Sequence, residues 1–210
     1  TLILLTITLY LLPTILTQTT CMNHGIHCDG SQGFQTTQNW HLRQIFTIEF
    51  WIFPETVADQ TQGVIQGFVL AGESSCDVNG YGFYSQNGSL YFVMGGTGVC
   101  GEDAVEILLE LNRWMHVAVS VDDDAVTVYV DGDEVESRMK VSDIRYGDEN
   151  SPLRICQGPE ENTGFDSGQL DEIRFWKIAR SSEEIRNYWN VSLNDDQINE
   201  DLLAYWRFDP

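Results

Sequence analysis

Alternating apolar and polar side chains mark most of this chain as β-strand. In residues 46–53 the apolar side chains fall at every second position, as they do again in residues 114–121 and 126–130. A period of two places one set of side chains on the buried face of a strand and the other set on the opposite face. Further strands are predicted at residues 153–156, 170–178 and 202–208. The pattern therefore predicts an all-β body of short strands.

Turn and helix signals divide these strands. Asn-Gly at residues 87–88 and Asp-Gly at residues 131–132 are typical of two-residue hairpin turns. A helix is predicted only over residues 182–189, where Ser181 and Glu184 form a capping box and apolar residues recur at helical spacing.

The first 20 residues form an apolar segment without a charged side chain. Three interpretations of this segment are open. It is the core of a secretory signal peptide, a short membrane anchor interrupted by Pro13, or a β-strand that stays in the mature protein. The apolar face of such a strand consists of Ile3, Leu5, Ile7, Leu9 and Leu11. A retained apolar strand must be covered, so it would pair with its own sheet or insert into a neighbouring subunit.

Length and charge limit the possible functions. The chain has 210 residues, with 11 Lys and Arg against 32 Asp and Glu, and a formal net charge of -21. This length suits one well-filled domain, expected at residues 24–210 behind the apolar segment at 1–20. The acidic excess argues against a nucleic-acid partner, because binding phosphate groups needs a surplus of Lys and Arg.

Cysteine usage favours an exported protein. Cys76 and Cys100 lie almost symmetrically about the predicted Asn-Gly turn, so that hairpin would bring their sulfur atoms together and form a disulfide. Cys28 with Cys156 is the second expected pair, which leaves Cys21 free or bonded to another chain.

Other candidate chemistry is sparse. N-glycosylation sequons begin at Asn87 and Asn190. His24 and His27 lie near two of the cysteines, but their spacing fits no zinc motif. The acidic clusters fall at predicted turns, which does not fit the facing carboxylates of a glycosidase, and we expect no enzymatic activity.

Polar and aromatic side chains on the outer faces of three predicted strands allow two interpretations. They are Glu49, Trp51, Glu172, Arg174, Trp176, Tyr205 and Arg207. Exposed together, they would form an aromatic platform that stacks on sugars or contacts another protein. We favour coverage instead, because the apolar stripe of the predicted helix, with Ile185, Tyr188 and Trp189, must be buried against something.

Four stretches together carry a family resemblance: Phe46-Thr-Ile-Glu-Phe-Trp-Ile-Phe-Pro, Trp114-Met-His-Val-Ala-Val-Ser-Val, Val126-Thr-Val-Tyr-Val-Asp-Gly and Gly168-Gln-Leu-Asp-Glu-Ile-Arg-Phe-Trp. In order and spacing they resemble the laminin-G-like jelly rolls of the concanavalin A-like superfamily. The resemblance covers roughly residues 24–210. It implies two antiparallel sheets packed face to face in a module that is usually extracellular, often calcium-assisted, and often binds glycans or matrix proteins.

The same resemblance implies a calcium site at Asp29 and Asp171, which match metal-binding acids of related sandwiches. Two functions are then expected. The first is a non-catalytic extracellular structural subunit that assembles through its apolar N-terminal strand into a filament or surface polymer. The alternative is a secreted or cell-surface, calcium-assisted adhesion module that binds a glycan or a protein after its signal peptide is cleaved.

Overall fold

The protein is mostly β-strand. The computed structural model describes residues 25–30, 33–56, 66–72, 80–86, 88–95, 105–140, 143–146, 151–158 and 167–208. Its elements are β1 (Ile26–Cys28), β2 (Phe34–Asn39), β3 (Phe46–Pro54), β4 (Gln66–Gly72), β5 (Gly80–Gln86), β6 (Ser89–Met94), β7 (Val105–Leu108), β8 (Met115–Val121), β9 (Ala125–Val130), β10 (Asp133–Met139), β11 (Pro152–Ile155), β12 (Gly168–Trp176), α1 (Ser182–Tyr188) and β13 (Leu202–Trp206).

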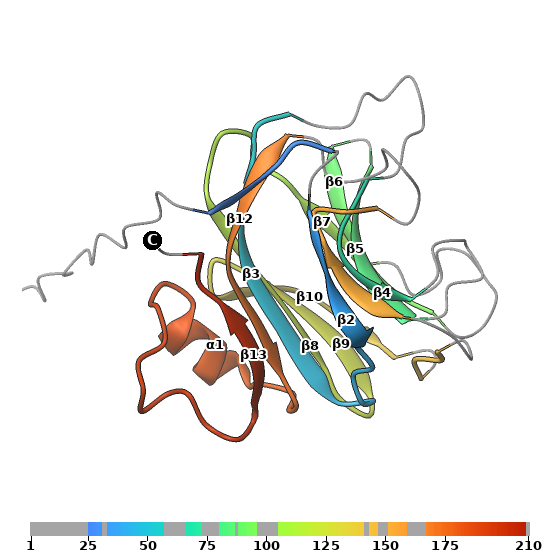
Figure 1. Cartoon of the computed structure of the whole chain (residues 1–210). Helices are drawn as coiled ribbons and strands as arrows, with labels where there is room; N and C mark the ends of the chain where they lie inside the picture. The colour runs from blue at the N-terminus through green and yellow to red at the C-terminus, as the bar shows by residue number, and fades with distance from the viewer. Residues whose placement is uncertain are drawn as a thin grey trace, which may run out of the picture.

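Two antiparallel sheets lie face to face (Figure 1). Sheet A has the strand order β1-β12-β3-β8-β9-β10, and β13 also pairs with β12. Sheet B has the order β2-β11-β4-β5-β6-β7. This arrangement confirms the antiparallel jelly-roll sandwich that the sequence pattern and the family resemblance predicted.

The core lies between the sheets, where the alternating apolar side chains meet. The predicted inward residues of β3 are all fully buried: Phe46, Ile48, Phe50 and Ile52. The ring of Phe50 packs edge-on against that of Phe83 in β5, with 4.8 Å between their centroids. Each such side chain contributes about 1.5–3 kcal/mol of hydrophobic stabilisation, so this interface holds the two sheets together.

Local signals in the sequence located the hairpins and the helix. β5 and β6 pair with Gln86 opposite Ser89, which leaves the two-residue turn predicted at residues 87–88. Helix α1 begins after Ser181, and both hydrogen bonds of the predicted capping box with Glu184 are present. The helix ends one residue earlier than predicted. Strands β2, β4 and β7 were not predicted.

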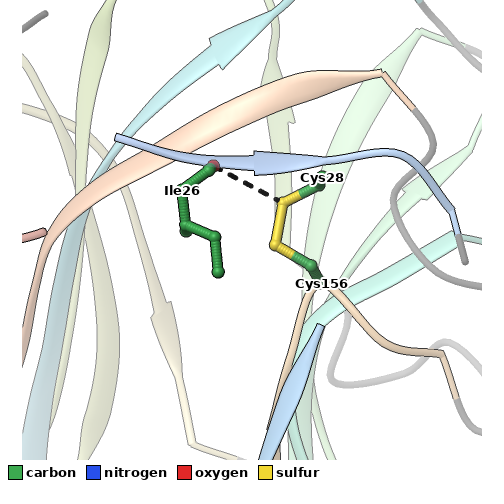
Figure 2. The surroundings of a disulfide bond; sticks show 3 residues. All are labelled: Ile26, Cys28 and Cys156. Atoms are coloured by element: carbon green, nitrogen blue, oxygen red, sulfur yellow. Dashed lines mark hydrogen bonds between the residues drawn. A yellow bond between two sulfur atoms is a disulfide. The ribbon is translucent and has the colours of Figure 1, made fainter. Parts of the chain in front are cut away.

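A disulfide joins the two sheets (Figure 2). Cys28 ends β1 in sheet A, Cys156 follows β11 in sheet B, and their Cα atoms lie 5.3 Å apart. The Cys28 sulfur also lies 4.0 Å from the carbonyl oxygen of Ile26, a contact only, because a disulfide sulfur carries no proton. Cys21 and the predicted pair Cys76–Cys100 lie outside the described residues, as do residues 1–20.

No helix in the described ranges is long and apolar enough to cross a membrane.

Replacing Cys28 and Cys156 together by Ser should lower the free energy of unfolding by about 2–5 kcal/mol, since the bond constrains a long loop in the unfolded chain. The two cysteines are 128 residues apart in the sequence. Urea denaturation followed by tryptophan fluorescence measures the difference. Equal unfolding free energies of variant and wild type would contradict the prediction.

Candidate functional site

The outer face of sheet A is covered. Ile185 of α1 is fully buried and packs against Ala118 of β8 and Tyr129 of β9. Beyond the helix, the ring of Trp189 lies 5.5 Å from that of Trp51 in β3. Figure 1 shows α1 and the chain leading to β13 against this sheet. The predicted coverage of the outward-facing residues is therefore confirmed.

Most of the seven side chains that were candidates for an exposed platform are buried. Those at most 7% exposed are Glu49, Trp51, Glu172, Arg174 and Trp176. Tyr205 is half-buried, and Arg207 is exposed. No sugar can stack on this face, because the helix and the following segment already occupy it.

Gly132, in the β9–β10 turn, permits this close packing. Its φ angle is +83°, and a Cβ atom placed on it would lie 2.4 Å from Cδ1 of Trp189. A larger residue would strain the turn and push Trp189 away.

A cluster of buried charges lies beneath the cover. Its members, which we call the Glu49 cluster, are Glu49, His116, Glu172, Arg174 and Arg180. The Glu49 carboxylate pairs with the guanidinium of Arg180, and its Oε2 lies 3.6 Å from Nη1 of Arg174 and 3.3 Å from Nε2 of His116. Arg174 pairs with Glu172 as well, at 2.6 Å.

The cluster also holds the chain that follows α1. Arg174 donates hydrogen bonds to the carbonyl oxygens of Tyr188, at 3.2 Å, and Val191, at 2.6 Å. Glu172 accepts from the hydroxyl of Ser192 at 2.8 Å and from the hydroxyl of Tyr205. Glu172 itself has a φ of +51° at a β-bulge in β12, so local backbone strain is retained where these bonds converge.

The surroundings of the cluster shift the pKa values of Glu49 and His116. Burial alone would raise the pKa of Glu49, but the hydrogen bond from His116 and the charges of Arg180 and Arg174 outweigh it and lower that pKa to about 2. Burial lowers the pKa of His116, against the opposing effect of Glu49. An ionised, solvent-sealed carboxylate has no access to a substrate, so the cluster acts in stability.

The outer face of sheet B carries no helix in the part of the chain that the structure describes. Helix α1, the only helix among the described residues, lies on the opposite side of the sandwich (Figure 1). Side chains alternate between the two faces along β6 and β7, so every second residue lies on the face away from the core. Tyr91 of β6 is thereby partly exposed, and Glu106 of β7 is exposed.

Four residues of this sheet share its outer face, and we call them the Tyr91 face: Tyr84, Tyr91, Glu106 and Arg154. Tyr84 stands opposite Tyr91 across β5 and β6, and Tyr91 stands opposite Glu106 across β6 and β7. The Tyr91 hydroxyl donates to Oε1 of Glu106 at 3.2 Å, and the Ser89 hydroxyl donates to the same atom at 2.7 Å. The carboxylate is thus held beside an aromatic ring.

The remaining aromatic and basic members of the Tyr91 face influence one another. Burial raises the pKa of Tyr84 to about 12, and the positive charge of Arg154 opposes that rise. Tyr84 is therefore a neutral phenol at neutral pH. Tyr84 is only 9% exposed, so Tyr91 is the ring that a ligand can reach, with the Glu106 carboxylate beside it.

The predicted calcium ligands are not neighbours. Asp29 follows β1, whose last residue Cys28 pairs with Gly168, whereas Asp171 lies three residues further along β12 and is buried. The register thus separates the two aspartates by four strand positions, about 13 Å. Among the described residues no group of three or more His, Cys, Asp or Glu could hold a metal. Calcium stays a prediction from the resemblance.

The structure also places the other candidate residues. Asn190 is exposed in the turn after α1, where a glycan could be attached, while Asn87 and His24 lie outside the described residues. His27 is exposed, with Nε2 at 3.8 Å from a carboxylate oxygen of Glu55.

The Tyr91 face was missed at the level of sequence. A signal for it exists in the alternation of residues 89–94 and 105–108, which leaves Tyr91 and Glu106 on the side away from the core. Which of these residues lie side by side depends on strand register, and β7 was not predicted at all.

A family model described as the concanavalin A-like lectin/glucanases superfamily matches residues 29–186. No curated protein matches the chain.

Solved structures share the fold. Domain 4 of an extracellular arabinanase from Geobacillus stearothermophilus, in complex with arabinotriose, aligns with a TM-score of 0.56 and 16% identity over 78% of this chain and 75% of that one. A putative carbohydrate-binding protein from Bacteroides ovatus aligns with a TM-score of 0.60 and 16% identity, over 88% of this chain and 49% of that one. The binding domain of Paraclostridial Mosquitocidal Protein 1 aligns with a TM-score of 0.58 and 19% identity, over 79% of this chain and 43% of that one. This chain thus spans less than half the length of the last two.

The substitution Glu49→Gln should lower the free energy of unfolding by about 3–5 kcal/mol, because it leaves two buried guanidinium groups without their shared anion. Urea denaturation of the variant measures this loss.

Glu106→Gln is the matched control, since Glu106 is an exposed carboxylate on a strand of the other sheet. Its unfolding free energy should stay within about 0.5 kcal/mol of wild type. Equal, small effects of the two substitutions would show that the Glu49 cluster does not stabilise the fold.

Proposed function

Because the chain belongs to the concanavalin A-like lectin/glucanases superfamily, we propose that it is a non-catalytic extracellular module that binds a glycan on the Tyr91 face. The observation that carries this proposal is the partly exposed ring of Tyr91, hydrogen-bonded to the exposed carboxylate of Glu106 on the side of the sandwich opposite α1 (Figure 1). Two structural neighbours support a glycan as the ligand: an arabinanase domain in complex with arabinotriose and a putative carbohydrate-binding protein.

The chemistry of the Tyr91 face suits a sugar. A sugar ring presents apolar C–H groups on its faces and hydroxyl groups around its rim. The ring of Tyr91 can pack against the former, while Glu106 accepts hydrogen bonds from the latter. Neither group needs a change of protonation, so the face binds a ligand and leaves its bonds intact.

The proposed location follows from the disulfide. The bond between Cys28 and Cys156 persists in oxidising surroundings, such as the outside of a cell, and is rare in reducing compartments. An exposed sequon at Asn190 is compatible with the same route. We therefore place the module in the secreted or cell-surface fraction.

The self-assembling subunit is the second candidate, and it rests on the alternation of apolar residues in segment 1–20. The exposed edge of sheet A offers such a strand little apolar surface, since β10 carries Asp133, Glu134, Glu136 and Arg138. Charged edge strands disfavour pairing with another chain. The binding module is the better supported of the two.

Tyr91→Ala should weaken binding to a glycan at least about fivefold, because loss of a central aromatic contact costs over about 1 kcal/mol. The measurement is affinity electrophoresis against a panel of soluble polysaccharides. Tyr188→Ala, which removes a tyrosine from α1 on sheet A, is the control and should bind as the wild type does. Equal loss in both variants would remove the Tyr91 face as the site.

Deleting residues 1–20 should change the affinity for the same polysaccharide by less than about twofold, because the Tyr91 face uses none of these residues. Size-exclusion chromatography of both forms tests the second candidate at the same time. A large assembly that dissociates into single chains on deletion would favour the self-assembling subunit over the binding module.

A further inference from the structure

We infer that the Tyr91 face selects glycans without carboxylate or sulfate groups and rejects their anionic counterparts. This inference rests on the proposed function, since it names the class of ligand for the same face. It is argued from the position of each charge relative to Tyr91.

Sheet B itself carries very little charge. Within its six strands, all of which belong to the described part of the chain, Glu106 and Arg154 are the charged residues. The two lie at different distances from the Tyr91 ring. Glu106 is on the adjacent strand, one spacing of about 4.8 Å away, whereas Arg154 on β11 is three spacings away, about 14 Å.

This difference decides which charge a ligand on Tyr91 meets. The screening length at physiological salt is about 8 Å, so an anion on Tyr91 is attracted by Arg154, three strands away, less strongly than it is repelled by Glu106 on the adjacent strand. The repulsion from Glu106 is not screened, because that carboxylate touches the Tyr91 hydroxyl. An anionic group at this position therefore encounters a net negative charge.

Hydrogen bonding points the same way. Glu106 is an acceptor that already receives the hydroxyl protons of Ser89 and Tyr91, and any further bond to it must come from a donor. Sugar hydroxyl groups are donors. Ionised carboxylate and sulfate groups only accept, so they give Glu106 no further hydrogen bond and add like-charge repulsion.

The sequences of four segments connected to sheet B are acidic as well. Segments 55–65, 73–79, 95–104 and 156–167 attach to strands of the sheet, and their sequences contain acids and no Lys or Arg. The acids are Glu55, Asp59, Glu73, Asp77, Glu102, Asp103, Glu160, Glu161 and Asp166.

The bases in the other connections of sheet B do not offset these acids. They are Arg43, Arg113, Lys140 and Arg145. Two of the four are already paired, Arg113 with Glu110 and Asp131, and Lys140 with Asp143. The formal net charge of -21 thus repels an approaching polyanion at long range.

The test compares matched polysaccharides that differ in charge: hydroxyethylcellulose with carboxymethylcellulose, dextran with dextran sulfate, and methyl-esterified pectin with polygalacturonate. Affinity electrophoresis of the full chain is run at low and at physiological salt. We expect a neutral member to bind at least about tenfold more tightly than its anionic partner at about 10 mM salt. The gap should narrow at about 150 mM, where the screening length falls from roughly 30 Å to 8 Å.

A variant distinguishes the effect of the Glu106 carboxylate from the effect of the protein's overall charge. Glu106→Gln should raise the affinity of the anionic member relative to the neutral one by at least about threefold. Glu134→Gln, which removes an exposed carboxylate from β10 in sheet A, should leave that ratio unchanged.

The outcomes that would contradict the inference differ from those that would contradict the proposed function. An anionic polysaccharide that binds as tightly as its neutral partner, or more tightly, overturns the selectivity and leaves glycan binding intact. Equal ratios in wild type and Glu106→Gln also overturn it. Failure to bind any of the six polysaccharides overturns the proposed function itself, and the selectivity with it.

Discussion

The ion pairs of Glu49 with Arg174 and Arg180 are the interaction on which the rest of this structure depends. Removing charges from water costs free energy unless they are paired and hydrogen-bonded. The cluster therefore depends on the segment that packs over sheet A and completes its hydrogen bonds. Helix α1 and the chain that follows it supply that cover, and Arg174 fixes its backbone through carbonyl groups. The outer face of sheet A is thereby closed, and the ligand face that we propose belongs to sheet B.

The sequence predicted the fold because its signals are local. Alternation in β3, β8 and β9 identifies both the strands and their buried faces, and the capping box at Ser181 locates the helix. The family resemblance supplied the two-sheet arrangement, which no single strand encodes. The predicted ends of β12 and β13 lie two residues too late, since the apolar residues Ile178 and Phe208 follow the last paired positions.

The candidate site was harder to predict, because its residues become neighbours only through strand register. Tyr91 and Glu106 belong to strands joined by a long connection, and their pairing is a property of the folded sheet. For Asp29 and Asp171, strand register has the opposite effect and separates two candidate residues. Each matches a family position, yet the pairing of β1 with β12 keeps them apart. The coverage of sheet A could be anticipated because an amphipathic helix must bury its apolar stripe.

Hydrogen–deuterium exchange, with and without the neutral polysaccharide that binds most tightly, tests most directly whether sheet B is the ligand face. The account predicts that the ligand slows exchange in β5, β6 and β7, around Tyr84, Tyr91 and Glu106, and leaves α1 unchanged. Slower exchange confined to α1 or to residues 189–201 would place the ligand on sheet A and contradict the account.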